Sequence, residues 1–375
     1  MSVIKGWCPD AWHPMAAGDG LLVRVRPMMG RIDGAQLAGL CDAAMSYGNG
    51  LIDLTSRANL QIRGVSERDW RPLVAQLVGL NLVHADPVME ARNSLLVAPD
   101  WKTGDDTVCI AAEWADRLAE FPDLPAKVGF AIDAGPAPLL MGKAGDFRIE
   151  PGAQGGLILR AAGRPTGAAV TRSSAVDALL ALAHWFVASG GREAGRMVRH
   201  KAALPDWAQG DVAAATPVLP LRPGRHALGF LYGVPFGQID AATLAELAPH
   251  AIRLTPWRML IAEGGEGRAI DGLLHDPADP LLRVDACPGQ PSCSQASVET
   301  RALAREVAPY VTGRLHVSGC AKGCARSAPA ALCLTGREGR YDLARHAKAG
   351  GPPQRAGLTH SDILAHLGVT DAACL

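Results

Sequence analysis

Residues 20–27, GLLVRVRP, alternate between apolar and polar positions with a period of two. This period predicts a β-strand with two different faces, because successive side chains of a strand point to opposite sides of the sheet. Leu22, Arg24 and Arg26 are expected on one face, and the side chains between them on the other.

The next two segments continue the pattern of a small mixed domain. Asp33 is a helix N-cap with Gln36 three residues later, and the apolar positions that follow keep a helical period until Gly48. Residues 51–64 return to a strand pattern. Its second half is expected to place four polar side chains on one face: Arg57, Asn59, Gln61 and Arg63.

The same order of elements returns in residues 229–258. Residues 30–40 and 237–247 share Gly, Ile, Asp, Ala, Leu, Ala and Leu at equivalent positions, and Leu-Thr…Arg recurs after each helix, with one extra residue expected in the second copy. Any capped helix rich in Ala and Leu looks similar. The recurrence of strand, turn, helix and strand in order favours a true duplication.

The remaining chain divides into two further segments. A helix is expected from residue 174 to about 189, where Gly190 and Gly191 end it. Residues 164–171 and 218–225 resemble linkers, because they are rich in Pro, Gly and Arg without periodicity. We therefore predict an α+β protein in which two duplicated half-domains alternate with two α/β domains. The expected boundaries are 1–94, 95–217, 218–282 and 283–375.

Four cysteines form two close pairs, C-x5-C and C-x3-C, with a predicted helix between the pairs. Four thiolates are the ligand set of a [4Fe–4S] cluster. Structural zinc is the competing interpretation, although its paired ligands usually stand two to four residues apart. Disulfides are a third, less favoured one. The expected ligands are Cys287, Cys293, Cys320 and Cys324.

Composition excludes several classes of function. The 37 basic and 37 acidic residues balance, so no global field for nucleic acid exists, and no apolar run is long enough to span a membrane. The first eight residues, MSVIKGWC, lack the apolar core of a secretory signal, which favours a cytoplasmic protein. The other cysteines are expected to be ordinary buried or free thiols: Cys8, Cys41, Cys109, Cys333 and Cys374.

Arginines on the first copy are the second candidate site. A solvated sheet face is the plain interpretation of Arg24, Arg26, Arg57 and Arg63. Guanidinium groups also bind carboxylates through paired hydrogen bonds, so arginines on adjacent strands can form the floor of a site for a polyanionic small molecule.

These motifs together resemble the sulfite and nitrite reductase superfamily, whose members hold a [4Fe–4S] cluster beside a siroheme. The resemblance covers nearly the whole chain and implies ferredoxin-like half-domains. It implies tetrapyrrole carboxylate binding by Arg24, Arg26, Arg57, Gln61 and Arg63. It also implies an anion pocket made by three further residues, Arg92, Asn93 and Lys127. Of these, Arg92 and Lys127 are the catalytic candidates.

The chain departs from the reductases at two positions. The reductases carry a second lysine where this chain has Gly129, and usually Asn where it has Lys322. Residues 18–24, 124–131 and 316–325 are instead most similar to the superfamily's cobalamin branch, the precorrin-3B synthases. A siroheme-dependent assimilatory reductase is the alternative, and an iron–sulfur protein without turnover is a third.

The cobalamin branch implies a monooxygenation of precorrin-3A by O2 at C20, with closure of a γ-lactone. Siroheme and precorrin-3A share a scaffold with eight carboxylates, so the same cradle suits either molecule. Siroheme itself belongs only to the alternative. A mononuclear non-haem iron is implied besides the cluster, together with an external one-electron donor such as a ferredoxin or flavodoxin.

The ligands of that iron are not assigned by the sequence. A non-haem oxygenase commonly uses two histidines and a carboxylate, but the chain contains no compact motif of this kind. The candidates, each more often an ordinary histidine, are His13, His84, His226, His275 and His316.

Overall fold

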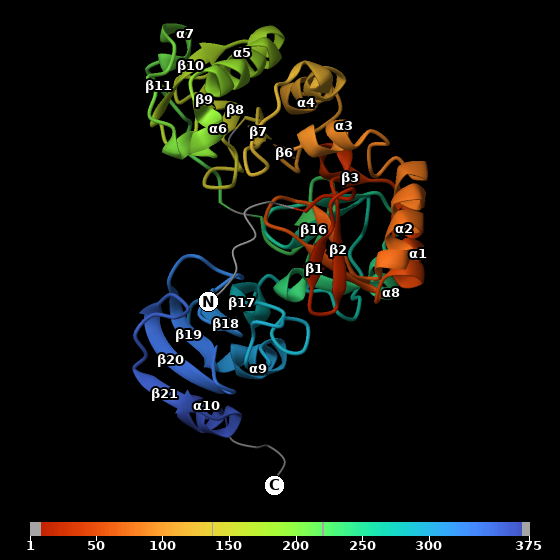
Figure 1. The fold of residues 1–375 in the computed structure, drawn as a ribbon, viewed down its shortest axis with the longest axis vertical. Helices are drawn as coiled ribbons and strands as arrows, with labels where there is room; N and C mark the ends of the chain where they lie inside the picture. The colour runs from red at the N-terminus through yellow and green to blue at the C-terminus, as the bar shows by residue number, and fades with distance from the viewer. Residues whose placement is uncertain (1–8, 137, 220, 370–375) are drawn as a thin grey trace.

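The computed structural model describes residues 9–136, 138–219 and 221–369. Cys8 and Cys374 lie outside the described residues, as does the segment MSVIKGWC. Four β-sheets with helices packed against them form an α+β architecture (Figure 1). Within the described ranges, no helix combines the length and the apolar character needed to cross a membrane.

The secondary structure comprises short strands and helices of very different lengths. The strands are β1 (Met15–Ala17), β2 (Gly20–Val25), β3 (Arg31–Ile32), β4 (Leu51–Leu54), β5 (Leu60–Val65), β6 (Leu95–Val97), β7 (Phe130–Ile132), β8 (Phe147–Pro151), β9 (Leu157–Ala161), β10 (Thr166–Val170), β11 (Val212–Ala213), β12 (Gly224–His226), β13 (Gly229–Gly233), β14 (Gln238–Asp240), β15 (Ile252–Leu254), β16 (Met259–Glu263), β17 (Val284–Ala286), β18 (Leu315–Ser318), β19 (Ala330–Arg337), β20 (Arg340–Ala347) and β21 (Arg355–Leu358). The α-helices are α1 (Gly34–Tyr47), α2 (Glu67–Gly79), α3 (Pro87–Arg92), α4 (Asp106–Asp116), α5 (Ala175–Ala188), α6 (Gly191–Ala194), α7 (Asp206–Gln209), α8 (Ala241–Ala245), α9 (Arg301–Val307) and α10 (His360–Leu367).

The two copies of the repeat exchange strands. The first sheet has the order β1-β2-β5-β4-β14, and the second has the order β12-β13-β16-β15-β3. Ile239 of the second copy lies opposite Ile52 of the first, and Ile32 of the first lies opposite Ile252 of the second. This reciprocal exchange confirms the predicted duplication and joins both half-domains into one body.

The capping signals act as the sequence predicts in the first copy. Asp33 accepts a hydrogen bond from the Gln36 N–H, the Gln36 side chain accepts one from the Asp33 N–H, and α1 ends at Gly48. The second copy forms the much shorter α8. Its N-cap, Asp240, makes no side-chain capping bond.

The turns after β4 and β15 correct one detail of the repeat. Ala58 and Arg258 have φ of 53° and 58°. In the first turn the Thr55 N–H donates to the Asn59 carbonyl, and in the second the Thr255 N–H donates to the Met259 carbonyl. The turns therefore have equal length. Arg57 corresponds to Trp257, and the extra residue expected in the second copy is not there.

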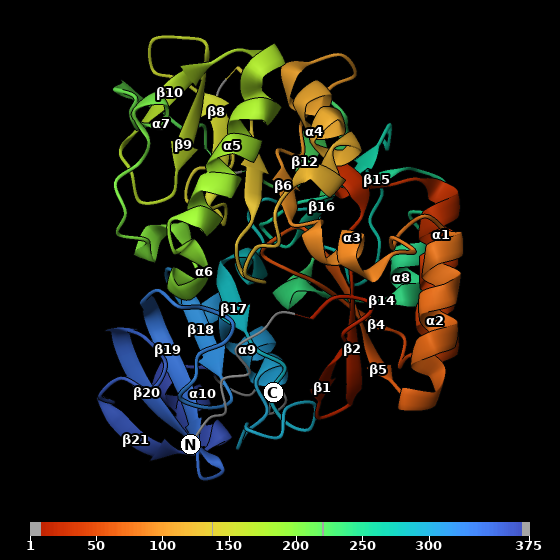
Figure 2. The same cartoon turned by 45° about the horizontal axis from the view of Figure 1, so that its top comes forward.

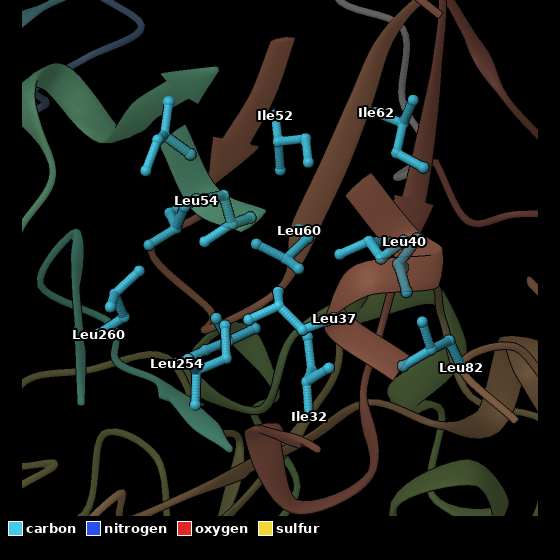
Figure 3. Close-up of a cluster of buried hydrophobic side chains, with 14 of the residues drawn as sticks. Ile32, Leu37, Leu40, Ile52, Leu54, Leu60, Ile62, Leu82, Leu254 and Leu260 are labelled. Atoms are coloured by element: carbon cyan, nitrogen blue, oxygen red, sulfur yellow. The ribbon is translucent and has the colours of Figure 1, made fainter. Parts of the chain in front are cut away.

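A single hydrophobic core lies between the two half-domains. Ile32, Leu54 and Leu60 of the first copy pack beside Leu254 and Leu260 of the second (Figure 3). All five side chains are at most 5% exposed. Because burial of apolar surface is the main stabilising term in folding, the two copies depend on each other for stability.

The first α/β domain contains a six-stranded sheet with the order β11-β10-β9-β8-β7-β6. The parallel strands β6, β7 and β8 lead to antiparallel neighbours, and α5 packs on the sheet. The expected helix at 174–189 is confirmed as α5. Residues 164–171, expected as a linker, instead contain β10, whose short side chains in the sequence TGAAV gave little strand periodicity.

The last domain has the sheet order β17-β18-β19-β20-β21. Its first three strands are parallel, and α9 forms the predicted helix between the two cysteine pairs. This domain, drawn in blue, approaches the rest of the chain at β17 in both views (Figure 2).

Candidate functional site

The arginine face begins with a cross-strand pair on the first sheet. Arg24 of β2 lies directly opposite Gln61 of β5, and its Nη2 donates a hydrogen bond of 3.1 Å to Gln61 Oε1. Both residues are half-buried. Strand alternation therefore brought these two predicted site residues to one face, as expected.

Arg57 crosses from the half-domain to the first α/β domain. The Thr55 hydroxyl accepts hydrogen bonds from the backbone N–H groups of Arg57 and Asn59, which fixes the turn. Arg57 Nη2 then donates a 2.7 Å bond to the carbonyl of Lys127. The Lys127 side chain itself is exposed.

Arg26 and Asn93 hold the end of α3. Arg26 Nη1 donates to the carbonyls of Glu90 and Asn93 at 2.8 and 3.2 Å, and Asn93 Nδ2 donates to the Arg26 carbonyl at 3.1 Å. A cation at a helix C-terminus is stabilised by the carbonyls there. Arg26 thus positions the adjacent Arg92, whose Nη1 donates to the Ala119 carbonyl at 2.9 Å.

Arg63 is held by ion pairs in the interior of the first half-domain, and its predicted role in ligand binding stays a prediction. It is 3% exposed and forms ion pairs with Asp19 at 2.8 Å and Asp53 at 2.7 Å. Gln238 from the exchanged strand β14 also donates to Asp53, at 2.8 Å. The guanidinium therefore joins segments of the first half-domain, and it is linked to the second copy only through Asp53 and Gln238.

Two cavities adjoin beside this face. The smaller is lined by Arg24, Arg26 and Arg57 together with Asn93 and Gly129. The larger has a volume of about 690 Å³ and a mainly apolar wall. Both include Arg26, Ser94, Ala126 and Phe130 in their linings, whereas Lys127 lines neither.

The larger cavity is lined by a polar pair, Asp10 and His13, of which the sequence analysis named only His13. Asp10 is 6% exposed, and its Oδ1 lies 2.7 Å from the His13 N–H and 3.2 Å from His13 Nδ1. Arg92 lines the same cavity. The spacing of Asp10 and His13 carries no recognised motif, so only the fold reveals that they reach this cavity.

The four predicted cluster ligands lie on two loops that pack together. Ser297 N–H donates to the Gly319 carbonyl at 2.9 Å, and Gly319 N–H points at Cys287 Sγ at 3.2 Å. Burial raises the pKa of the Cys324 thiol, Lys322 opposes this shift, and the other three predicted ligands reinforce it. The other three predicted ligands thus lie close enough to Cys324 to act on its charge.

This arrangement fits a cluster by the chemistry of its donors and by its backbone. A Cβ on Gly319 would lie 2.5 Å from the Ala296 side chain, so the loops approach at a position that only glycine allows. A cubane has an iron at each of four corners, so its thiolates stand farther apart than the ligands of one ion. In the described part of the chain, no group of three or more His, Cys, Asp or Glu is arranged to hold a single metal ion.

The candidate histidines occupy separate places. His13 pairs with Asp10, and Trp12 Nε1 donates to the carbonyl of His84 at 2.9 Å, so these two segments are adjacent. His226 belongs to β12. His316 is fully buried in β18, and His275 lies in the loop after β16.

Comparison with known proteins identifies relatives along the whole chain. Residues 13–80 match the nitrite/sulfite reductase ferredoxin-like half domain. Precorrin-3B synthase of Sinorhizobium sp is 30% identical over 94% of this chain and 85% of its own length. Ferredoxin–nitrite reductase of Synechococcus elongatus is 26% identical over 90% of this chain and 80% of its own.

The fold comparison agrees with these matches. The structure of the Mycobacterium tuberculosis NirA protein superposes with a TM-score of 0.62, at 17% identity. The match covers 92% of this chain and 78% of that one, and at this identity it shows the fold.

Proposed function

This chain belongs to the precorrin-3B synthase family of the nitrite and sulfite reductase superfamily, and we propose that it performs the O2-dependent monooxygenation of precorrin-3A at C20. One oxygen atom enters the macrocycle and the ring A acetate closes a γ-lactone. The other oxygen atom leaves as water, with two electrons and two protons supplied from outside the substrate. The product precedes ring contraction in cobalamin synthesis.

The observation that carries this proposal is the wall at Gly129. A Cβ there would lie 2.9 Å from the Ser94 carbonyl oxygen, so the backbone packs at this position against a glycine, where the reductases have their second lysine. That lysine supplies charge and protons for a six-electron reduction. Its loss suits a site that holds the tetrapyrrole as substrate rather than as a haem-like cofactor.

The arginine face supplies the binding groups. Arg24 and Arg57 bind carboxylates of the macrocycle, with Gln61 orienting Arg24 through their hydrogen bond. Arg26 and Asn93 hold the α3 end in place. Arg92 and Lys127 are the catalytic candidates. Arg92 lines the larger cavity and stabilises negative charge developing on oxygen, while Lys127, exposed outside both cavities, is the candidate for proton supply.

The two cysteine loops hold the cluster through Cys287, Cys293, Cys320 and Cys324. When bound, a [4Fe–4S] cluster supplies electrons one at a time, which activation of dioxygen requires. The chain contributes the Gly319 N–H that faces Cys287 Sγ. Hydrogen bonds to cluster sulfurs are one of the means by which proteins set reduction potentials. The electrons come from an external donor of the ferredoxin or flavodoxin class.

A siroheme-dependent reductase is the second candidate, which the relative named ferredoxin–nitrite reductase favours. The absorption spectrum of the purified protein distinguishes the two candidates. We expect the broad brown absorbance of a cluster without a siroheme band. A siroheme band, with nitrite- or sulfite-dependent oxidation of a reduced viologen dye, contradicts the proposal.

A further inference from the structure

Asp285 forms ion pairs with three arginine side chains at once. Its carboxylate lies 2.9 Å from Arg258 Nη1, 3.3 Å from Arg326 Nη1 and 3.7 Å from Arg314 Nη1. Arg258 comes from the second half-domain, whereas the other two belong to the cluster-binding domain.

Lys143 of the first α/β domain adds a fourth cation. Its Nζ donates to the Pro256 carbonyl at 3.2 Å and lies 5.2 Å from the centre of the Trp257 ring. Burial lowers the pKa of Lys143, and the nearby charges of Arg258 and Arg314 lower it further. These four cations and Asp285 are called the basic group below.

One carboxylate does not balance four cations. Like charges held together away from bulk water are costly unless an anion offsets them, so a basic group of this kind is stabilised by a bound anion. The group is also within reach of a ligand, because 26% of the Arg258 and Arg326 side chains and 42% of that of Arg314 are exposed.

A buried histidine gives a second, independent sign of a ligand. His316 lies beside Asp285 in the parallel pairing of β17 and β18 and is 0% exposed. Its Nδ1 faces Cys333 Sγ at 3.8 Å, while its Nε2 has no hydrogen-bond partner among the described residues. Buried polar groups are nearly always paired, so an unpaired imidazole nitrogen next to a cation cluster indicates a missing partner.

The basic group joins the two parts of the proposed site. Ala144, the neighbour of Lys143, lines the smaller arginine cavity. On the other side, Arg258 Nη2 donates to the Ala325 carbonyl at 3.0 Å, directly after Cys324. The group therefore connects the arginine face with the cysteine loops.

We propose that the basic group is a second carboxylate subsite, which takes acidic side chains on the edge of the tetrapyrrole nearest Cys324. This proposal rests on the proposed function, in that the ligand is a tetrapyrrole with eight carboxylates. Guanidinium groups from two domains then bind the same ligand. Binding of this ligand also fixes the cluster-binding domain against the half-domains.

Two porphyrins with the same macrocycle test the subsite in the full-length, cluster-loaded protein. Uroporphyrin III carries eight carboxylates and etioporphyrin III carries none, and binding of each is measured by fluorescence titration. Arg314→Gln and Lys143→Met are each expected to weaken uroporphyrin binding about tenfold, which is the loss of one charge-assisted contact. Binding of etioporphyrin III is expected to stay unchanged, because it has no carboxylate for the subsite to take.

Arg340→Gln is the matched control, because Arg340 is an exposed arginine of the same domain at the start of β20. Arg326→Lys is expected to retain most of the affinity, because the charge remains. Equal losses for both porphyrins, or no loss for either, overturn the subsite. A siroheme band in the purified protein overturns the proposed function alone, because siroheme carries the same eight carboxylates.

Discussion

Gly129 lies directly against Ser94, so that a Cβ on Gly129 would stand 2.9 Å from the Ser94 carbonyl oxygen and 3.6 Å from Arg57 Nη1. At Gly129 the wall of the smaller cavity is therefore formed by backbone atoms. Arg57 lies close to this part of the wall and donates to the Lys127 carbonyl. Gly129 thus stands where the reductases carry a lysine, and its lack of a side chain leaves room for Arg57.

Gly129→Ala is expected to weaken binding of uroporphyrin III, because the added methyl group pushes Ser94 or Arg57 from its place. An affinity loss of about fivefold to thirtyfold corresponds to about 1–2 kcal/mol, which lies within the usual cost of overpacking. Gly135→Ala is the control, since nothing lies within 4 Å of a Cβ at that position. Equal affinities for the two variants would show that the wall does not shape the site.

Arg57→Met is expected to weaken the same porphyrin by about tenfold or more, because a charge-assisted hydrogen bond is worth roughly 1.5–3 kcal/mol. Cluster absorbance is expected to stay unchanged. The comparison variant is Arg68→Met, whose native side chain is 94% exposed. Unchanged affinity in Arg57→Met would show that the arginine face is a solvated surface without a role in binding.

Replacing Cys287, Cys293, Cys320 or Cys324 by alanine is expected to abolish the brown absorbance, since each supplies one thiolate of a four-thiolate set. Iron content per chain is measured alongside the spectrum. Cys109→Ala, a change at a half-buried thiol of the first α/β domain, is expected to leave both unchanged. If all four variants keep the absorbance, the ligand assignment is wrong.

Glu90 gives a pH dependence of stability. It is 1% exposed, and burial raises its pKa to about 7, although the His84 N–H bond and the charge of Arg26 act in the opposite direction. Because the pKa of Glu90 is higher in the folded state than in the unfolded state, protonation of Glu90 stabilises the fold. This stabilisation is fully present below the pKa of the unfolded state. It is lost as the pH rises through about 7.

Glu90→Gln is therefore expected to reduce the fall in the free energy of unfolding between pH 5 and pH 8 by up to about 3 kcal/mol. Urea midpoints at the two pH values measure the difference. Glu266→Gln, at an exposed position, is expected to behave as the unsubstituted protein does. Parallel pH profiles for Glu90→Gln and the unsubstituted protein would rule out this origin.

Local signals explain what the sequence could predict. The capping residues of α1 and the alternation in β2 act over a few neighbouring positions, so both elements were predicted from the chain alone. Two loops that each carry a cysteine pair are likewise visible in the spacing. The repeat was visible because its two copies keep the same order of elements.

Tertiary pairing explains what the sequence could not predict. The exchanged strands β3 and β14 are two and three residues long, too short for any periodicity, and their partners lie in the other copy. The ion pairs of Arg63 could not be seen in the sequence because its partners, Asp19 and Asp53, come from other segments. The basic group escaped notice for the same reason, since its members come from three domains.

The central claim is that the tetrapyrrole is a substrate that gains oxygen from O2. Its most direct test is mass spectrometry of the product formed from precorrin-3A under 18O2, with the cluster-loaded protein and a reduced ferredoxin. The account predicts one 18O atom in the product, at C20, and none after incubation under 16O2 in H218O. Recovery of unlabelled, unchanged precorrin-3A, with reduction of nitrite or sulfite by the same preparation, would contradict it.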